Sequence, residues 1–203
     1  CKENGVKLLG GGVSRHGEFF TSFTSNKIDS AIQSIKNIMN LEDDQICMRL
    51  LDNTSGTNIV NHLYRYIHPT HFGNATEKLR SVLKSSLRTC LAGNGPGFGE
   101  FAYTMASLPN SKGGFGVTDP RVLEQYAYIS TYIATYEEQT KLFPQLSKEF
   151  PPEVVKLINK HIENFPPADR ESTKELTLLP HIKKQKQLAM LLSSEIRSST
   201  IRE

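Results

Sequence analysis

Residues 74–92 read NATEKLRSVLKSSLRTCLA, and this stretch decides the fold class. Its apolar residues recur at intervals of three and four, the spacing that places side chains on one face of an α-helix. The glycine-rich run at 93–97 then ends the helix, because glycine readily adopts the backbone angles that follow a last helical turn. The stretch therefore predicts an amphipathic helix whose buried stripe consists of Leu79, Val82, Leu83, Leu87 and Leu91.

Helical spacing continues on both sides of this stretch. The sequence predicts further helices over residues 25–40, 99–107 and 118–143, another around 154–162, and a last one that begins near Pro180. One more opens at Glu42-Asp43-Asp44, breaks or kinks near Gly56, and ends before Pro69, because the residue before a proline avoids helical angles. In the helix over 118–143, the residues expected to face inward are Val122, Leu123, Tyr126, Ala127, Ile129, Ile133 and Ala134.

The front of the chain differs from the rest. Residues 6–13 predict a short strand that runs into a glycine turn. The predicted fold class is therefore mainly α, a helical bundle with a short N-terminal β element. We expect three parts, namely the β element at 1–15, a helical domain at 16–143, and a proline-punctuated helical extension at 144–203.

Composition excludes several classes of protein. A net charge of +3 with 37% hydrophobic and 22% charged residues is typical of a globular chain and excludes collagen-like fibres and disulfide-dense secreted scaffolds. No apolar run approaches the roughly 18–20 residues of a membrane span. The cysteines, Cys1, Cys47 and Cys90, form no CxxC pair, which favours a reducing, intracellular compartment. With no initiator Met and an end inside a helical pattern, both termini look like cuts through a longer protein.

Two groups of residues are candidates for metal binding, and each has a simpler interpretation. The cluster of His62, His68 and His71 could supply two metal ligands. No cysteine or carboxylate completes the set, so a polar, half-exposed helix end is favoured. The run Glu42-Asp43-Asp44 has the composition of a Mg²⁺ site. Acidic residues also stabilise the first turn of a helix, and we favour that structural interpretation. We predict no catalytic residue in this chain.

Basic residues on the helix at 74–92 are the more specific candidates. Arg80, Lys84 and Arg88 are four residues apart, so they line one face, which we call the basic stripe. Such a stripe can follow the phosphates of a nucleic acid, with Ser81 and Ser85 adding neutral contacts. A solvated surface face is the alternative, and the same two interpretations apply to a second basic run, Lys183-Lys184-x-Lys186.

Three motifs in a fixed order resemble a known family. They are Gly5-Val6-Lys7-Leu8-Leu9-Gly10, then Leu108-Pro109 with Gly113-Gly114-Phe115-Gly116-Val117, then Tyr126-Ala127-Tyr128-Ile129-Ser130. This order resembles the segment after the catalytic palm in reverse transcriptases of non-LTR retrotransposons, which are RNA-directed DNA polymerases. Phe115 stands where that family usually has Leu, and Val117 where it has Ile. The resemblance covers residues 5–143, with a weak further match at 185–188.

The resemblance implies a function. Leu9 and Gly10 would belong to the primer-grip hairpin, with Lys7 beside the primer end, and the helices would form a thumb that holds template–primer duplex. Arg80, Lys84 and Arg88 would then contact the backbone of an RNA–DNA or DNA duplex. The family's catalytic aspartates precede this segment, so the chain alone would not polymerise DNA. Mg²⁺ would belong to the parent enzyme, whose palm and fingers would be the protein partner.

A second interpretation remains open on the sequence. The chain would be a helical scaffold or protein-interaction module without a nucleic-acid role, binding a partner helix in an apolar groove. Binding to duplex should weaken steeply with salt, because released counterions supply the affinity. Binding through an apolar surface should depend little on salt.

Overall fold

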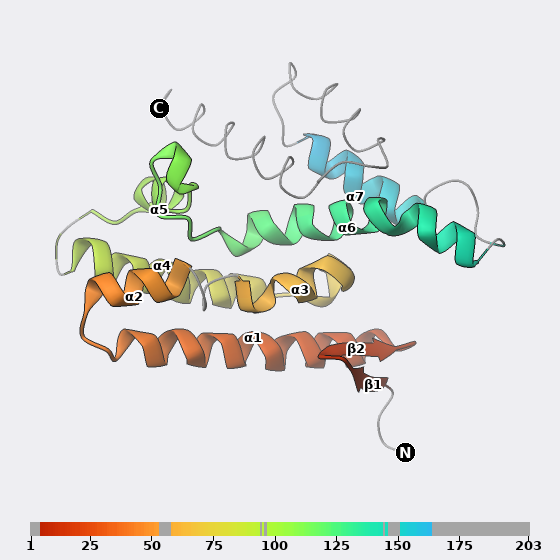
Figure 1. Ribbon diagram of the computed structural model, residues 1–203, viewed down its shortest axis with the longest axis horizontal. Helices are drawn as coiled ribbons and strands as arrows, with labels where there is room; N and C mark the ends of the chain where they lie inside the picture. Colours follow the sequence, from red (N-terminus) through yellow and green to blue (C-terminus); the bar gives the residue numbers. More distant parts are fainter. Residues whose placement is uncertain are drawn as a thin grey trace. The chain divides into compact units, whose positions relative to one another are not determined.

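The computed structural model describes residues 5–52, 58–93, 95, 97–143, 145 and 151–163 of the chain. It confirms the predicted fold class, since the protein is mainly helical with a short antiparallel hairpin at its N-terminal end (Figure 1). The chain divides into two compact units, Cys1–Glu124 and Gln125–Glu203. The boundaries that the sequence suggests, after residues 15 and 143, stay predictions.

The described elements follow one another in chain order. The hairpin consists of β1 (Gly5–Leu8) and β2 (Gly11–Ser14). The helices are α1 (Gly17–Met39), α2 (Asp44–Leu50), α3 (Asn58–Tyr66), α4 (Ala75–Ala92), α5 (Glu100–Ala106), α6 (Pro120–Leu142) and α7 (Pro152–Glu163). Two short 3₁₀ turns, η2 (Pro69–His71) and η3 (Asn110–Lys112), precede α4 and α6. The helix predicted near Pro180 lies outside the described residues.

The hairpin confirms the predicted N-terminal β element and adds a second strand after the glycine turn. Strands β1 and β2 pair antiparallel, with Leu8 opposite Gly11. Leu9 and Gly10 connect them with φ angles of 48° and 84°. Positive φ at both central residues is typical of the two-residue turns whose twist matches that of paired strands. Leu9 and Gly10 therefore form a tight turn that leads directly from β1 into β2.

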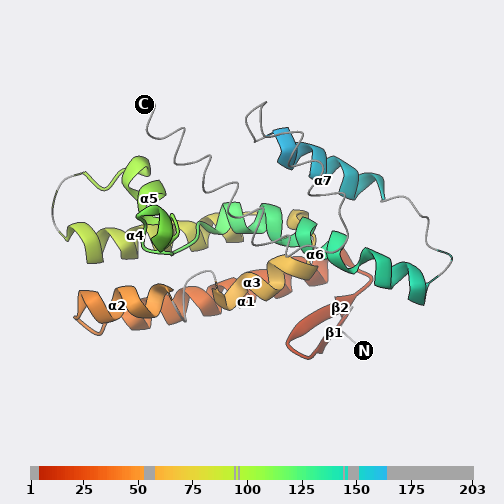
Figure 2. The ribbon, with the colours of Figure 1, turned by 45° about the horizontal axis from the view of Figure 1, so that its top comes forward.

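Helix α1 packs against α4, α3 and α2, and these elements form the core of the first unit (Figures 1 and 2). The predicted stripe of α4 is largely confirmed, because Leu79, Leu83 and Leu87 are fully buried while Leu91 is exposed. Ile28 and Ile35 of α1 are fully buried as well. Packing of such apolar stripes supplies most of the stability of helices in water.

Helix α1 begins at Gly17, eight residues before the predicted start. The additional turns have partners from other elements. Phe19 and Phe23 stack with ring centroids 5.8 Å apart and lie against the hairpin glycine Gly12. Thr24 donates a hydrogen bond to the carbonyl of His71 at 2.9 Å. These tertiary contacts, and not local spacing, extend the helix.

The acidic run at 42–44 opens α2 as predicted. The Asp43 carboxylate accepts hydrogen bonds from the backbone N–H groups of Gln45 and Ile46 at 3.0 and 2.9 Å. Asp43 therefore satisfies donors that a helix start leaves without intrahelical partners. The helical stretch predicted from here to Pro69, with a break or kink near Gly56, consists of two separate helices, α2 and α3. Gly56, the expected position of the break, lies outside the described residues.

Helix α6 begins at Pro120, two residues after the predicted start at 118, and proline suits the first turn of a helix. The Asp119 carboxylate accepts from the Arg121 N–H at 2.9 Å. The second unit buries Ile129 and Ile133 of α6 with Val154 and Ile158 of α7. Ala134 was expected inside but is exposed, because it lies one residue, or about 100° of helix rotation, beyond Ile133.

Candidate functional site

Arg80 of the predicted basic stripe lies inside the protein. Its residue is only 7% exposed. The guanidinium donates to Asp119 at 2.9 Å and also to Glu100. It stacks 4.8 Å from the ring centroid of Tyr103. The N–H donors of the planar Arg80 guanidinium therefore link α4 to α5 and to the start of α6. They do not face solvent, where a phosphate would bind.

Neighbouring charges complete this network. Lys84 donates to Glu100, and Arg121 lies 3.3 Å from Glu77. Hydrogen bonds from Arg80 and Lys84 lower the pKa of Glu100 to about 2. Burial alone would lower the pKa of Arg80, but the hydrogen bonds to Glu100 and Asp119 outweigh it and raise the pKa. The network is thus a structural clamp of paired charges.

The solvent-facing side of α4 carries a different set of residues. It consists of six exposed positions, which we call the exposed face of α4: Glu77, Lys78, Ser81, Ser85, Arg88 and Thr89. Of the three stripe residues, only Arg88 belongs to it, since Lys84 is half-buried beside Glu100. Lys78 lies outside the basic stripe that the sequence indicates. Its exposure can be predicted from its position on the side of the helix opposite the apolar stripe. The four-residue spacing of the cations does not include it.

The hairpin residues Lys7 and Leu9 are exposed, and Leu9 is 100% exposed at the tip beside Gly10. One side of the hairpin lies on α1, where a Cβ on Gly5 or Gly12 would come within 3 Å of the Phe19 ring. The Gly12 N–H also donates to the Tyr66 hydroxyl at 3.0 Å. The hairpin is therefore anchored to α1 and α3.

The opposite side of the hairpin is apolar and exposed. Its side chains, which we call the outer face of the hairpin, are Val6, Leu8 and Val13, all at least 56% exposed. Val6 and Val13 are directly opposite each other in the register. Sequence reasoning did not single out this patch, because alternation alone does not tell which side of a strand is covered.

The predicted site residues thus fall into two groups on different elements. Lys7, Leu9 and Gly10 lie on the hairpin beside α1, whereas Arg80 and Lys84 face α5. Arg88 lies on the exposed face of α4. The second basic run, at Lys183, Lys184 and Lys186, lies outside the described residues.

The histidine candidates occupy a helix end and a 3₁₀ turn. His62 is exposed on α3, and His68 is the N-cap of η2. The ring of His71 lies 5.4 Å from that of Phe20. Across the described ranges, no group of three or more His, Cys, Asp or Glu side chains is arranged to hold a metal ion.

The searched part of the chain also contains no helix that is long and apolar enough to cross a membrane. Comparisons with family models, curated proteins and solved structures found no match for this chain. The chain's own residues and the order of its motifs are therefore what indicates its function.

Proposed function

We propose that this chain is a non-catalytic, duplex-gripping part of a larger reverse transcriptase-like protein. The observation that supports the proposal most is the exposed face of α4, on which Lys78 and Arg88 flank Ser81 and Ser85. The carboxylate of this face, Glu77, is paired with Arg80 and Arg121. Lys78 and Arg88 are ten residues apart, or about 15 Å along a helix. That length spans several phosphates of one duplex strand, at about 3.4 Å each.

The two cations are the principal contacts in this proposal. The Ser81 hydroxyl donates a hydrogen bond to the carbonyl of Glu77 at 2.9 Å. To donate to a phosphate instead, it would have to break this hydrogen bond. Arg80 and Lys84 keep α4 in place against α5. The Mg²⁺-dependent chemistry belongs to the palm of the parent protein, and the ligand is an RNA–DNA or DNA duplex inside the cell, in cytoplasm or nucleus.

A salt titration tests the proposal. A labelled RNA–DNA hybrid is titrated with the full chain at several salt concentrations, and log affinity is plotted against log salt. Each phosphate contact contributes a slope of about 0.9, so the double variant Lys78→Ala/Arg88→Ala should reduce the slope by about 2. The matched control, Lys36→Ala/Lys156→Ala, removes two exposed cations from α1 and α7 and should leave the slope unchanged.

Two outcomes would count against the proposal. Equal slopes for the double variant and the control would mean either that the duplex contacts another surface or that the net charge of the chain alone determines the affinity. Absence of hybrid binding at low salt would remove the nucleic-acid role from this chain.

A second candidate function is a protein-interaction module, favoured by the outer face of the hairpin. Exposed contiguous apolar side chains often mark protein contacts. Replacing Val6, Leu8 and Val13 with Thr keeps β-propensity while removing apolar surface. The variant should bind less of the dye ANS than the natural chain does, with unchanged duplex binding. Equal dye binding by both would count against this candidate.

A further inference from the structure

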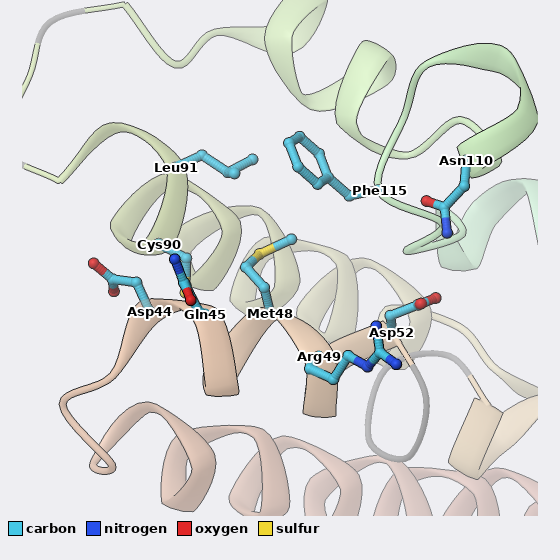
Figure 3. A pocket seen from close by; sticks show the side chains of 9 residues that line it. All are labelled: Asp44, Gln45, Met48, Arg49, Asp52, Cys90, Leu91, Asn110 and Phe115. Carbon is cyan, nitrogen blue, oxygen red and sulfur yellow. The ribbon is translucent and has the colours of Figure 1, made fainter.

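The first unit contains a pocket between α2, the end of α4 and the loop that follows α5 (Figure 3). Its volume is about 390 Å³, which lies within the range of about 300–1,000 Å³ that ligand sites occupy. Its walls include six residues that matter here: Asp44, Met48, Asp52, Leu91, Asn110 and Phe115. We call it the α2–α4 pocket.

The glycine motif at 113–117 builds one wall of this pocket. A Cβ on Gly114 would lie 2.0 Å from the carbonyl oxygen of Leu108, and one on Gly116 would lie 2.7 Å from the Asp52 carboxylate. Gly116 also has a φ of 78°, which residues with side chains rarely adopt. The Phe115 N–H donates to the Ala106 carbonyl at 2.9 Å. Glycines on both sides therefore hold the Phe115 ring over the pocket, where it is 46% exposed.

The middle of the pocket is apolar. Figure 3 shows the Met48 side chain directed between Leu91 and Phe115. Cys90 also lines this part. Burial, with a further contribution from the nearby Asp44 carboxylate, raises the pKa of the Cys90 thiol to about 11. Near neutral pH the thiol is therefore uncharged and adds apolar wall.

The two ends of the pocket differ in charge. Asp44 lies at one end, directly after Glu42 and Asp43, and all three residues are exposed. Arg49 lies at the other end, beside Asp52 in the view of Figure 3. Negative potential is therefore concentrated at the Asp44 end. Carboxylates in this position repel phosphate groups and attract cationic side chains.

We propose that the α2–α4 pocket docks a basic amphipathic helix of a partner protein. One large apolar side chain of that helix fills the space among Met48, Leu91 and Phe115, as buried anchors do at protein interfaces. A Lys or Arg four residues away, about 6 Å along the partner helix, faces Asp44. This contact is separate from duplex binding, which uses the exposed face of α4.

Fluorescence anisotropy with three labelled, alanine-rich 13-residue peptides tests the proposal on the full chain. The first peptide has a central Leu with Lys four residues before and after it. The second replaces Leu with Ser, and the third replaces both Lys with Glu. We expect the first peptide to bind at least tenfold more tightly than either of the others. Equal binding of the Ser peptide, equal binding of the Glu peptide, or no binding of the first would overturn the proposal.

Variants of the chain then locate the contact. Phe115→Ser and Asp44→Asn should each weaken binding of the first peptide at least fivefold, and both change exposed side chains. The control Asp29→Asn neutralises an exposed carboxylate on α1 and should leave affinity unchanged. Circular dichroism confirms that each variant is folded. Folded pocket variants that bind as tightly as the control would overturn the assignment to this pocket, whatever the outcome of the duplex titration.

Discussion

At the scale of single residues, Arg80 stabilises the contact of three elements. Its guanidinium has a carboxylate from α5, a carboxylate that precedes α6, and the ring of Tyr103 as neighbours. Asp119 is itself mostly buried, with a side chain 15% exposed. Removing the cation would leave this carboxylate without its main counter-charge in a partly desolvated place, which is costly.

We therefore expect Arg80→Met to lower the free energy of unfolding by about 3 kcal/mol, the cost of breaking a buried ion pair. Urea denaturation monitored by circular dichroism measures the change. The matched variant Arg88→Met removes an exposed arginine from the same helix and should cost less than about 0.5 kcal/mol. Similar losses for both variants would contradict the structural role of Arg80.

The Glu100 carboxylate predicts how stability depends on pH. Hydrogen bonds from Arg80 and Lys84 lower its folded-state pKa to about 2, against about 4.3 in an unfolded chain. A lowered carboxylate pKa stabilises the fold fully above the unfolded value, and this contribution is lost as pH falls from about 5 toward 2. The Glu100 side chain is 62% exposed, so solvent screens the pair and keeps the effect modest.

Glu100→Gln should therefore be less stable than the natural chain at pH 7, and this difference should shrink at pH 3. Urea denaturation at pH 7, 5 and 3 measures it. The control Glu138→Gln removes an exposed pair with Lys141, which should change stability by less than about 0.5 kcal/mol. A difference that grows as pH falls would reverse the expected sign.

At the scale of elements, the loop after α5 depends on glycine for steric reasons. Gly113 has a φ of 86°, and Gly114 packs directly on the Leu108 carbonyl. The loop is held by backbone hydrogen bonds back to residues 106–109. A side chain at 114 would force these segments apart.

Gly114→Ala should accordingly lower the free energy of unfolding by about 2 kcal/mol or more, since the backbone must shift to make room. Gly99→Ala is the control, because no heavy atom lies within 4 Å of a Cβ there. It should cost less than about 1 kcal/mol, the small loss expected because Gly99 is the N-cap of α5, where glycine is preferred to alanine. Thermal or urea denaturation compares the two. Equal stability of the two variants would show that the loop relaxes freely.

At the scale of the whole molecule, the two compact units have separate hydrophobic cores. The first is built around Ile28, Ile35, Leu79 and Leu83. The second contains Ile129, Ile133, Val154 and Ile158. A charge buried in one core is expected to disrupt that core first, because its desolvation cost is local.

Ile133→Asp should therefore remove hydrogen-exchange protection from the α6 and α7 amides of the second unit while α4 stays protected. Exchange measured by mass spectrometry resolves the units by peptide. The control Ile46→Asp changes an apolar residue that is 51% exposed and should leave both units protected. Loss of protection in α4 as well would mean that the molecule unfolds as one cooperative body.

The sequence by itself determined the elements whose signals are local. Helix α4, the short α5 and the start of α6 follow from apolar spacing and from capping residues such as Asp119, which act within a few residues of chain. The fold class follows from the same signals. The acidic run at 42–44 was interpreted correctly because capping is also local.

Tertiary structure alone decided the rest. Whether Arg80 faces solvent or Asp119 depends on a contact across 39 residues of chain, which spacing along one helix cannot reveal. The early start of α1 depends on Phe19 meeting the hairpin, and the α2–α4 pocket combines three distant segments. Periodicity tells which side of a helix is apolar, but burial of a charge depends on which partner the fold brings to it.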